Sequence, residues 1–220
     1  MILRVSGLEK SFGARRVLAG VEFRVEEGEC VALVGGNGSG KTTILRSIAG
    51  LVRPDGGRIE IAGFDAVADG ARARRSLSYL PQRPAFPGTL TVRETLEFVA
   101  DLRGLPPSRV DDEIERCGLA GLAGADVGNL SGGERQRLAL AAALLPEAAL
   151  ALFDEPSSNL DARATAIFLE RAREITAAGR SLLFTTHIPA DLEHLAGRVV
   201  TLSEGRAAES RFRALAGGRA

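Results

Sequence analysis

The residues with the clearest chemistry form one glycine-rich segment, Gly35-Gly36-Asn37-Gly38-Ser39-Gly40-Lys41-Thr42-Thr43. Its spacing, GxxxxGK[ST], is typical of a loop that binds the phosphates of a nucleotide. Glycines allow successive backbone N–H groups to point at phosphate oxygens. Lys41 would add a full positive charge for the β- and γ-phosphates, and the Thr42 hydroxyl could ligate Mg²⁺. The segment predicts binding of a nucleoside triphosphate, but it does not separate kinases, GTPases, helicases and transporters.

A pair of acids, Asp154 and Glu155, directly follows the apolar run Leu150–Phe153. Open α/β sheets place their ligand sites at the carboxyl ends of strands. Asp154 is therefore predicted to hold the Mg²⁺ shell, which leaves Glu155 to polarise a water molecule. The alternative is a pair of solvated acids at a strand end, and the phosphate loop upstream argues against it.

A third candidate is the segment Leu130–Arg137, which reads Leu-Ser-Gly-Gly-Glu-Arg-Gln-Arg. Ser131 is a good helix N-cap, and Glu134 is at the third position after it. Gly132 and Gly133 leave backbone N–H groups open to approach, so the segment predicts a second anion cradle. Two cradles in one chain imply either two ligands or one ligand shared between two chains.

The elements that must position these residues follow from hydrophobic patterns. Residues 2–5 and 21–25 alternate between apolar and polar, which indicates half-buried strands of an antiparallel edge. Val21, Phe23 and Val25 would share the buried face. The continuous apolar runs 30–34, 149–153 and 181–185 instead indicate strands buried on both faces of a parallel sheet.

Helical patterns occupy the rest of the chain. A helix predicted from about 162 to 178 separates two of the parallel strands, as in a βαβ unit. Helices are also expected between about 83 and 146, where Ser108 and Asp111 resemble a capping box. We therefore predict one α/β domain with a mostly parallel sheet, an antiparallel edge and an inserted helical subdomain. The core would comprise about 1–82 and 147–205, and a short tail 206–220.

Composition limits the alternatives. The 220 residues carry 28 basic and 28 acidic side chains, so no overall field favours nucleic acid or anionic lipid. The apolar runs are too short to span a bilayer, and the N-terminus lacks the apolar region of a signal peptide. With only Cys30 and Cys117, we expect inert thiols and no disulfide framework.

The segment Leu130–Arg137 resembles the signature motif of ABC ATPases, and further landmarks occur in that family's order from about Leu8 to Gly205. Gln82 in Tyr79-Leu80-Pro81-Gln82 is similar to the Q-loop glutamine. Ser158-Asn159-Leu160-Asp161 resembles the D-loop. Two further residues match on position: Phe12, where an aromatic often stacks on adenine, and His187, similar to the switch histidine. Gly36 departs mildly from the family, because proline is frequent at its position.

The resemblance implies a P-loop NTPase of ABC type that uses ATP and Mg²⁺. Lys41, Glu155 and His187 would be catalytic, and Thr42, Gln82 and Asp154 would hold the metal. The ATP-binding residues would be Phe12, Gly35, Gly36, Asn37, Gly38, Ser39, Gly40, Lys41, Thr42 and Thr43. Phe12 as core packing and His187 as a surface histidine are the alternatives.

The resemblance also decides between the two explanations for two cradles in one chain, and it implies one ligand shared between two chains. Ser131, Gly132, Gly133 and Glu134 would cover the γ-phosphate held by another subunit, which implies an ATP-dependent head-to-tail dimer with itself or a paralogue.

The same resemblance implies an ATPase that powers transport through separate membrane-spanning subunits, from a cytoplasmic position on the inner face of the cell membrane. The Pro-rich loop 83–90, with Phe86, is expected to be exposed and to dock on the membrane subunit, or else to be merely structural. The stretch from Leu90 to Leu105 resembles compact exporter-type cassettes, which implies export. A soluble ABC ATPase of translation or DNA maintenance is the alternative, and a P-loop kinase is a third. No nucleic acid partner is expected.

Overall fold

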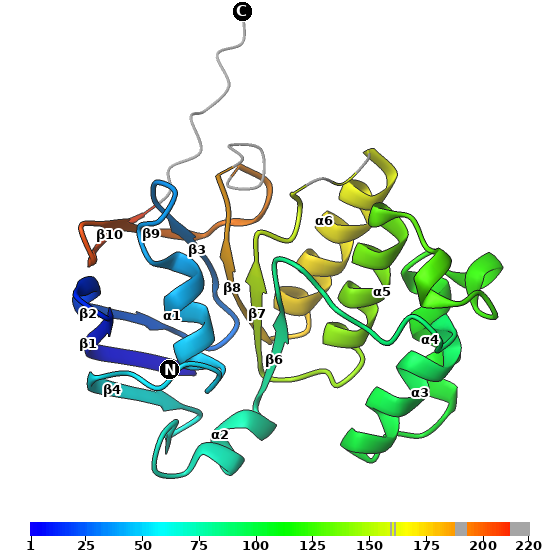
Figure 1. The fold of residues 1–220 in the computed structure, drawn as a ribbon, viewed down its shortest axis with the longest axis horizontal. Helices are drawn as coiled ribbons and strands as arrows, with labels where there is room; N and C mark the ends of the chain where they lie inside the picture. Colours follow the sequence, from blue (N-terminus) through cyan, green and yellow to red (C-terminus); the bar gives the residue numbers. More distant parts are fainter. Residues whose placement is uncertain (159, 161, 188–192, 212–220) are drawn as a thin grey trace, which may run out of the picture.

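A computed structural model describes residues 1–158, 160, 162–187 and 193–211. Two sheets form one side and the middle of the molecule, and helices pack beside them (Figure 1). This arrangement confirms the predicted α/β class with a mostly parallel sheet, an antiparallel portion and helices. None of the helices in the described ranges is long and apolar enough to cross a membrane.

The antiparallel portion is a four-stranded sheet at the N-terminal end of the chain. In spatial order its strands are β2 (Arg15–Val25), β1 (Leu3–Phe12), β4 (Gly56–Ile61) and β5 (Phe64–Asp65). The predicted alternation holds, because Val21, Phe23 and Val25 are buried while Glu22 and Arg24 are exposed. Period-two burial of this kind is expected of a sheet with only one face on the core.

The second sheet has six strands. In order they are β10 (Arg206–Arg211), β9 (Arg198–Ser203), β3 (Cys30–Val34), β8 (Ser181–Thr185), β7 (Leu150–Asp154) and β6 (Leu77–Leu80). The strands from β9 to β6 are parallel, and only β10 runs antiparallel to its neighbour. The three continuous apolar runs are thus β3, β7 and β8, as predicted. The segment expected to be a tail begins instead with β10.

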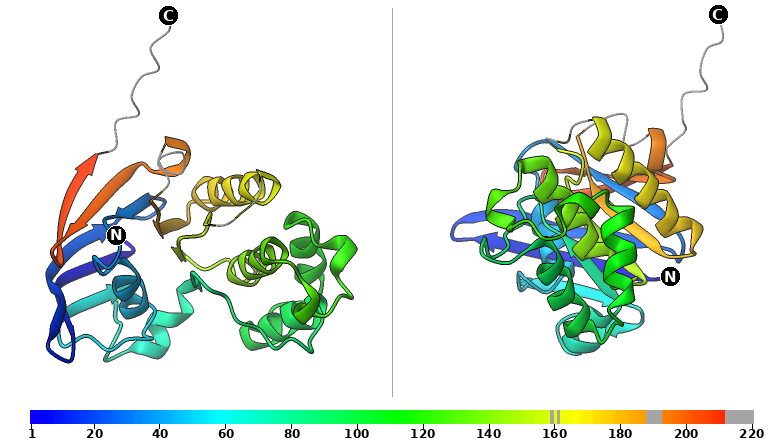
Figure 2. Two further views of the ribbon diagram at one scale, coloured as in Figure 1. Left: turned by 45° about the horizontal axis from the view of Figure 1, so that its top comes forward. Right: turned by 90° about the vertical axis from the view of Figure 1, so that its right-hand side faces the viewer.

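Helices connect and cover the strands. They are α1 (Lys41–Ile48), α2 (Gly70–Arg75), α3 (Val92–Arg103), α4 (Ser108–Arg116), α5 (Gly132–Leu144) and α6 (Ala162–Ala177), with short 3-10 turns at Ala120–Leu122 and Val127–Asn129. Helices α3, α4 and α5 lie between β6 and β7 in the chain. In Figure 2 they gather on the side of the molecule opposite the antiparallel strands.

The capping box predicted at Ser108 is wrong. Pro107 already has helical dihedrals, φ −55° and ψ −32°, so Ser108 is the first helical residue and its side chain caps nothing. A proline fixes φ near the helical value and starts the turn one residue early. The capping box of this region is instead at Thr91 and Glu94, at the start of α3.

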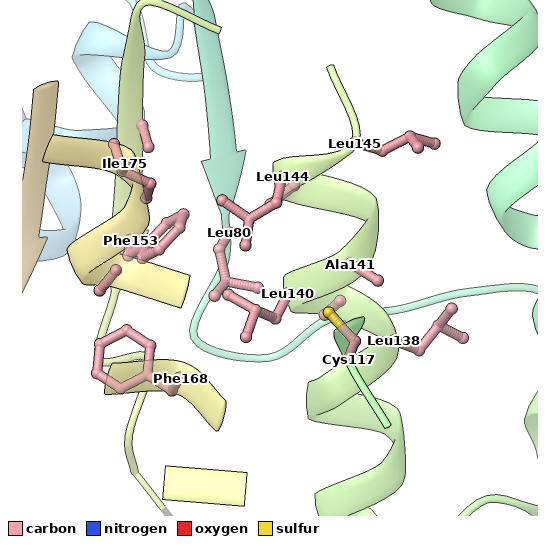
Figure 3. Packing of buried hydrophobic residues seen from close by; sticks show 14 of the residues in the cluster. Leu80, Cys117, Leu138, Leu140, Ala141, Leu144, Leu145, Phe153, Phe168 and Ile175 are labelled. Atoms are coloured by element: carbon pink, nitrogen blue, oxygen red, sulfur yellow. The ribbon is translucent and has the colours of Figure 1, made fainter. Parts of the chain in front are cut away.

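The parallel sheet separates two hydrophobic clusters, and β7 contributes to both. Leu150 and Leu152 belong to the cluster on the side of α1, whereas Ala151 and Phe153 belong to the cluster formed with α5 and α6. Figure 3 shows Phe153 in that second cluster with Phe168, and their ring centroids are 6.3 Å apart. Close packing on both faces of β7 fixes the position of the residues that follow it.

The two cysteines are buried and free. Burial raises the pKa of Cys30 to about 12, and it also raises the pKa of Cys117 well above the usual value. A thiol that stays protonated is a poor nucleophile and metal ligand. Both cysteines therefore behave as the inert thiols that were expected.

Candidate functional site

A cleft of about 400 Å³ opens where the loops after β1, β3, β6 and β7 meet. The residues that line it are Phe12, Arg15, Val17, Asn37, Gly38, Gly40, Lys41, Thr42, Thr43, Gln82 and Glu155. The carboxyl ends of parallel strands are where open α/β sheets bind ligands. The structure thus brings the aromatic of β1, the glycine-rich loop, Gln82 and Glu155 to one place.

The glycine-rich loop connects β3 to α1, and two of its glycines are required by space. A Cβ atom on Gly35 would lie 2.5 Å from the carbonyl oxygen of Leu202. One on Gly40, which has φ 108°, would lie 2.8 Å from a methyl carbon of Leu18. Distances below 3 Å are clashes, so the loop keeps this shape only with glycine at both positions.

Lys41 closes the loop from within. Its side chain is nearly buried, and Nζ donates to the carbonyl oxygens of Gly35 at 2.8 Å and Gly36 at 3.2 Å. Within the ranges that the structure describes, no carboxylate forms a salt bridge with it. A buried charge held only by carbonyl dipoles attracts an anion strongly, and the N-terminus of α1 adds to this attraction.

Asp154 lies at the end of β7 and is 1% exposed. Its Oδ1 accepts hydrogen bonds from Thr42 Oγ1 at 3.1 Å and from Thr185 Oγ1 at 2.8 Å. Its Oδ2 is buried and has no hydrogen-bond partner among the described residues. Burial raises the pKa of Asp154, and the neighbouring carboxylate of Glu155 raises it further.

The next residue, Glu155, adopts a left-handed backbone with φ 49°. Its N–H donates to Thr185 Oγ1 at 2.8 Å, and its Oε2 accepts from Gln82 Nε2 at 2.8 Å. His187 is more distant, with Nδ1 3.8 Å from the same oxygen and a side chain that is 58% exposed. Left-handed conformations of residues other than glycine are uncommon and cluster at functional sites.

Phe12 is the last residue of β1, and its ring is at the mouth of the cleft. It is 52% exposed and belongs to neither hydrophobic cluster. The alternative in which Phe12 packs in the core is therefore wrong. An exposed aromatic face beside a phosphate loop is suited to stacking on a nucleobase.

The Ser131–Glu134 segment is located at the start of α5, and its expected capping box is confirmed. The Glu134 N–H donates to Ser131 Oγ at 3.3 Å, while the Ser131 N–H donates to Glu134 Oε2 at 2.8 Å. The hydroxyl and N–H of Ser131 lower the pKa of Glu134. None of these residues lines the cleft, so the structure places this segment apart from the glycine-rich loop, and its role as a second anion cradle stays a prediction.

Two other expectations concern loops. In the segment similar to the D-loop, Ser158 Oγ donates to the Glu155 carbonyl at 2.8 Å, whereas Asn159 and Asp161 lie outside the described residues. Phe86, expected to be exposed, is half-buried and packs against the cluster formed by α5 and α6. Together with Val99 and other residues it lines a groove of about 240 Å³.

Sequence reasoning missed two residues of the site. Thr185 bonds both acids but was included only as the last residue of the apolar run 181–185, and Arg15 was not singled out at all. The available signal for Thr185 was its place at the end of the third apolar run, because parallel strands in register bring their last residues together.

Comparison with known proteins agrees with this geometry. A family model described as "ABC transporter" matches residues 18–158. The Nod factor export ATP-binding protein I of Rhizobium sp. (strain N33) is 37% identical over 206 residues, 92% of this chain and 68% of its own length. The daunorubicin resistance ATP-binding protein DrrA3 of Streptomyces coeruleorubidus is 36% identical over 208 residues, 93% of this chain and 66% of that protein. This chain therefore spans about two thirds of these relatives.

Solved structures are similar as well. One described as the ATP binding subunit of an ABC transporter superposes with a TM-score of 0.89 at 33% identity, and covers 96% of this chain and 90% of its own. A nucleotide-free ATP-binding cassette from an ABC transporter has a TM-score of 0.83 at 23% identity, covering 96% and 92%, and supports the fold alone.

Proposed function

Because the chain belongs to the ABC transporter family, as the match over residues 18–158 shows, we propose that it binds and hydrolyses ATP to power export through separate membrane-spanning subunits. The observation that carries the proposal is the pair Asp154 and Glu155: the hydroxyl of Thr42, in the phosphate loop, bonds Asp154, and the hydroxyl of Thr185 on β8 bonds both acids. The names of the relatives, which include export and drug resistance, favour transport over the alternative of a soluble ATPase.

The phosphate loop would hold the triphosphate. Lys41, now bonded to Gly35 and Gly36, would turn its ammonium to the β- and γ-phosphates while the N–H groups of 35–43 face the remaining oxygens. Phe12 would stack on adenine at the mouth of the cleft.

The donor atoms around Asp154 fit a magnesium ion. The buried Oδ2 has no partner among the described residues, and the Thr42 hydroxyl is bonded to the same carboxylate. Among the described residues, no group of three or more His, Cys, Asp or Glu side chains is arranged so that it could hold a metal ion by itself. Magnesium is commonly held by only one or two protein oxygens together with substrate phosphates. Thr42, Asp154 and Gln82 would hold it, and when bound it neutralises charge on the β- and γ-phosphates.

Glu155 would orient and activate the attacking water molecule. Its carboxylate lines the cleft, and Gln82 Nε2 orients it through a 2.8 Å hydrogen bond. A carboxylate in this position can orient the attacking water and accept its proton. His187, 3.8 Å from the same oxygen, would contact the γ-phosphate. Thr185 is a positioning residue, because it holds both acids without lining the cleft.

A second chain would complete the site. The N–H groups at Ser131–Gly133 lie at a capped helix start away from the cleft of their own chain. In a head-to-tail dimer, with itself or a paralogue, they would cover the γ-phosphate held by the other subunit. Gln136 links this helix to the segment after Glu155, because its Nε2 donates to the Pro156 carbonyl at 3.3 Å. Closure would thereby be coupled to the catalytic acids.

The membrane-spanning partner would dock in the groove beside Phe86. This groove lies between the segment after β6 and helices α3 and α5, and its lining includes Pro84, Ala85 and Val99. Its lining residues Pro81 and Pro84 lie on either side of Gln82, so docking and the catalytic cleft share one segment. The protein would then work from the cytoplasm at the inner face of the cell membrane.

The test joins hydrolysis to assembly. Glu155→Gln keeps the shape of the side chain but removes the base, so turnover should fall by about 10²–10⁴-fold while ATP binding survives. The variant should then accumulate as a dimer in ATP and return to monomer when ATP is removed. Size-exclusion chromatography with and without ATP measures this directly.

Two second-site changes in Glu155→Gln serve as test and control. Ser131→Arg places a bulky side chain in the second cradle and should abolish the dimer, although ATP still binds. Ser108→Arg introduces the same side chain at the exposed start of α4 and should leave the dimer intact. If Glu155→Gln elutes at the same volume with and without ATP, both as the isolated protein and in the membrane complex, the shared site is contradicted.

A further inference from the structure

A tight turn at Gly13 and Ala14 connects β1 to β2 and brings two residues face to face. Phe12 pairs directly with Arg15, and Ser11 pairs with Arg16. Directly opposed residues of an antiparallel pair carry their side chains on the same face of the sheet. Arg15 therefore shares the face of Phe12, whereas Arg16 lies on the opposite face.

The guanidinium of Arg15 reaches the phosphate loop. Arg15 lines the cleft, and a Cβ atom placed on Gly38 would lie 3.4 Å from Arg15 Nη2. Val17, two residues along β2 and so on the same face, lines the same cleft. The position of Arg15 is thus set by the strand register, and it points at the middle of the loop.

The charges nearby single out Arg15. Lys10 Nζ is 2.7 Å from Asp55, and Arg16 Nη2 is 2.9 Å from Glu9, so both cations are neutralised by the protein. For Arg15, the structure records no salt bridge to any carboxylate in the ranges it describes. A guanidinium that faces an anion site without a protein counter-charge is suited to the anion itself, and its planar fork matches phosphate geometry.

We propose that Arg15 is a further nucleotide-binding residue, which contacts the phosphate chain between the base on Phe12 and the loop at Gly38. The inference rests on the proposed function of the cleft. It adds a ligand that belongs to neither the phosphate loop nor the acid pair, and it makes the β1–β2 turn a unit that contacts base and phosphate together.

Nucleotide titration by calorimetry tests the assignment. Arg15→Ala should weaken ATP and ADP binding by about tenfold, because one charge-assisted contact to phosphate is lost at a partly solvated site. Its affinity should also depend less steeply on salt concentration. Arg15→Lys, which keeps the charge but loses the fork, should recover part of the loss. Arg16→Ala is the matched control and should bind like the unmodified protein, since Arg16 is occupied by Glu9.

The outcomes separate the two proposals. If the unmodified protein binds ATP and Arg15→Ala binds it with the affinity and salt dependence of Arg16→Ala, the inference about Arg15 is wrong and the proposed function stands. If the unmodified protein does not bind ATP, the proposed function itself fails. Because Arg15 is exposed, its variants should melt at the temperature of the parent, which circular dichroism checks.

Discussion

Replacing Arg171 should destabilise the protein far more than replacing a neighbouring arginine. Arg171 on α6 and Glu113 on α4 are 6% and 2% exposed, and Arg171 Nη2 donates to both carboxylate oxygens at 2.8 Å. Among the residues that the structure describes, the other side-chain donor to Glu113 is the weak thiol of Cys117, at 3.3 Å. Arg171→Met would leave a buried carboxylate with that thiol alone, and breaking a buried pair in this way costs about 3–5 kcal/mol.

A loss of this size is easy to measure. It corresponds to a change of about 10²–10⁴ in the unfolding equilibrium, and to a fall of about 6–20 °C in melting temperature for a chain of this length. Thermal melts and urea titrations followed by circular dichroism give both quantities. Arg116→Met is the control, because Arg116 shares its partner Glu174 with Arg171 but is itself exposed, and exposed pairs contribute about 0–1 kcal/mol.

A double replacement separates pairing from packing. Glu113→Met with Arg171→Met removes both charges and fills similar volume, so it should recover most of the stability lost in the single variant. Equal melting temperatures for Arg171→Met and Arg116→Met would refute the reasoning, because the buried pair would then contribute no more than a surface pair.

Two further predictions concern binding. Lys41→Ala should weaken ATP binding by about 100-fold or more and abolish turnover while leaving the fold intact, because within the protein it loses only two hydrogen bonds to carbonyls of the glycine-rich loop. Calorimetry decides, and unchanged affinity would contradict the phosphate role. Phe86→Asp and Ala85→Asp should both release the protein from its membrane complex with little effect on basal ATPase activity. Ala85 is exposed and lines the groove, so its variant should fold normally. Thr89→Asp, in the same loop, is the control. If the protein still co-purifies with the membrane complex after both changes, the groove is excluded as the docking surface.

The elements that could be predicted from the sequence are those with a strong local pattern. Strands β3, β7 and β8 are apolar throughout because both of their faces are buried, and the phosphate loop is defined by spacing alone. Strand β10 was missed because Arg206–Arg211 is polar at most positions, and it becomes a strand only by pairing with β9. The start of α4 was misplaced because a proline one residue earlier overrides a serine.

The residues of the site divide in the same way, into those that lie in local sequence motifs and those whose role depends on strand pairing. Lys41, Asp154 and Glu155 lie in continuous motifs, so their types and spacing were sufficient to find them. Thr185 is 31 residues from Asp154 in sequence, and its role depends on the parallel register that sets Asp154 opposite Thr185. Arg15 depends likewise on the register of the β1–β2 pair. Contacts made by tertiary pairing leave no periodic pattern in the chain, so Arg15 needed coordinates, and for Thr185 the sequence offered only its place at the end of an apolar run.

The left-handed backbone of Glu155 explains how two adjacent acids serve one site. In an extended strand neighbouring side chains point to opposite faces, so Asp154 and Glu155 would normally diverge. With φ 49° the chain turns at Glu155, so its carboxylate lines the cleft while Asp154 bonds Thr42 of the same cleft. Such a backbone costs about 1–3 kcal/mol. The Thr185 hydroxyl offsets part of that cost, because it accepts from the Glu155 N–H and donates to Asp154. The strain at the end of β7 is thus the physical means by which the acid proposed to bind metal and the acid proposed to activate water can be consecutive in the chain.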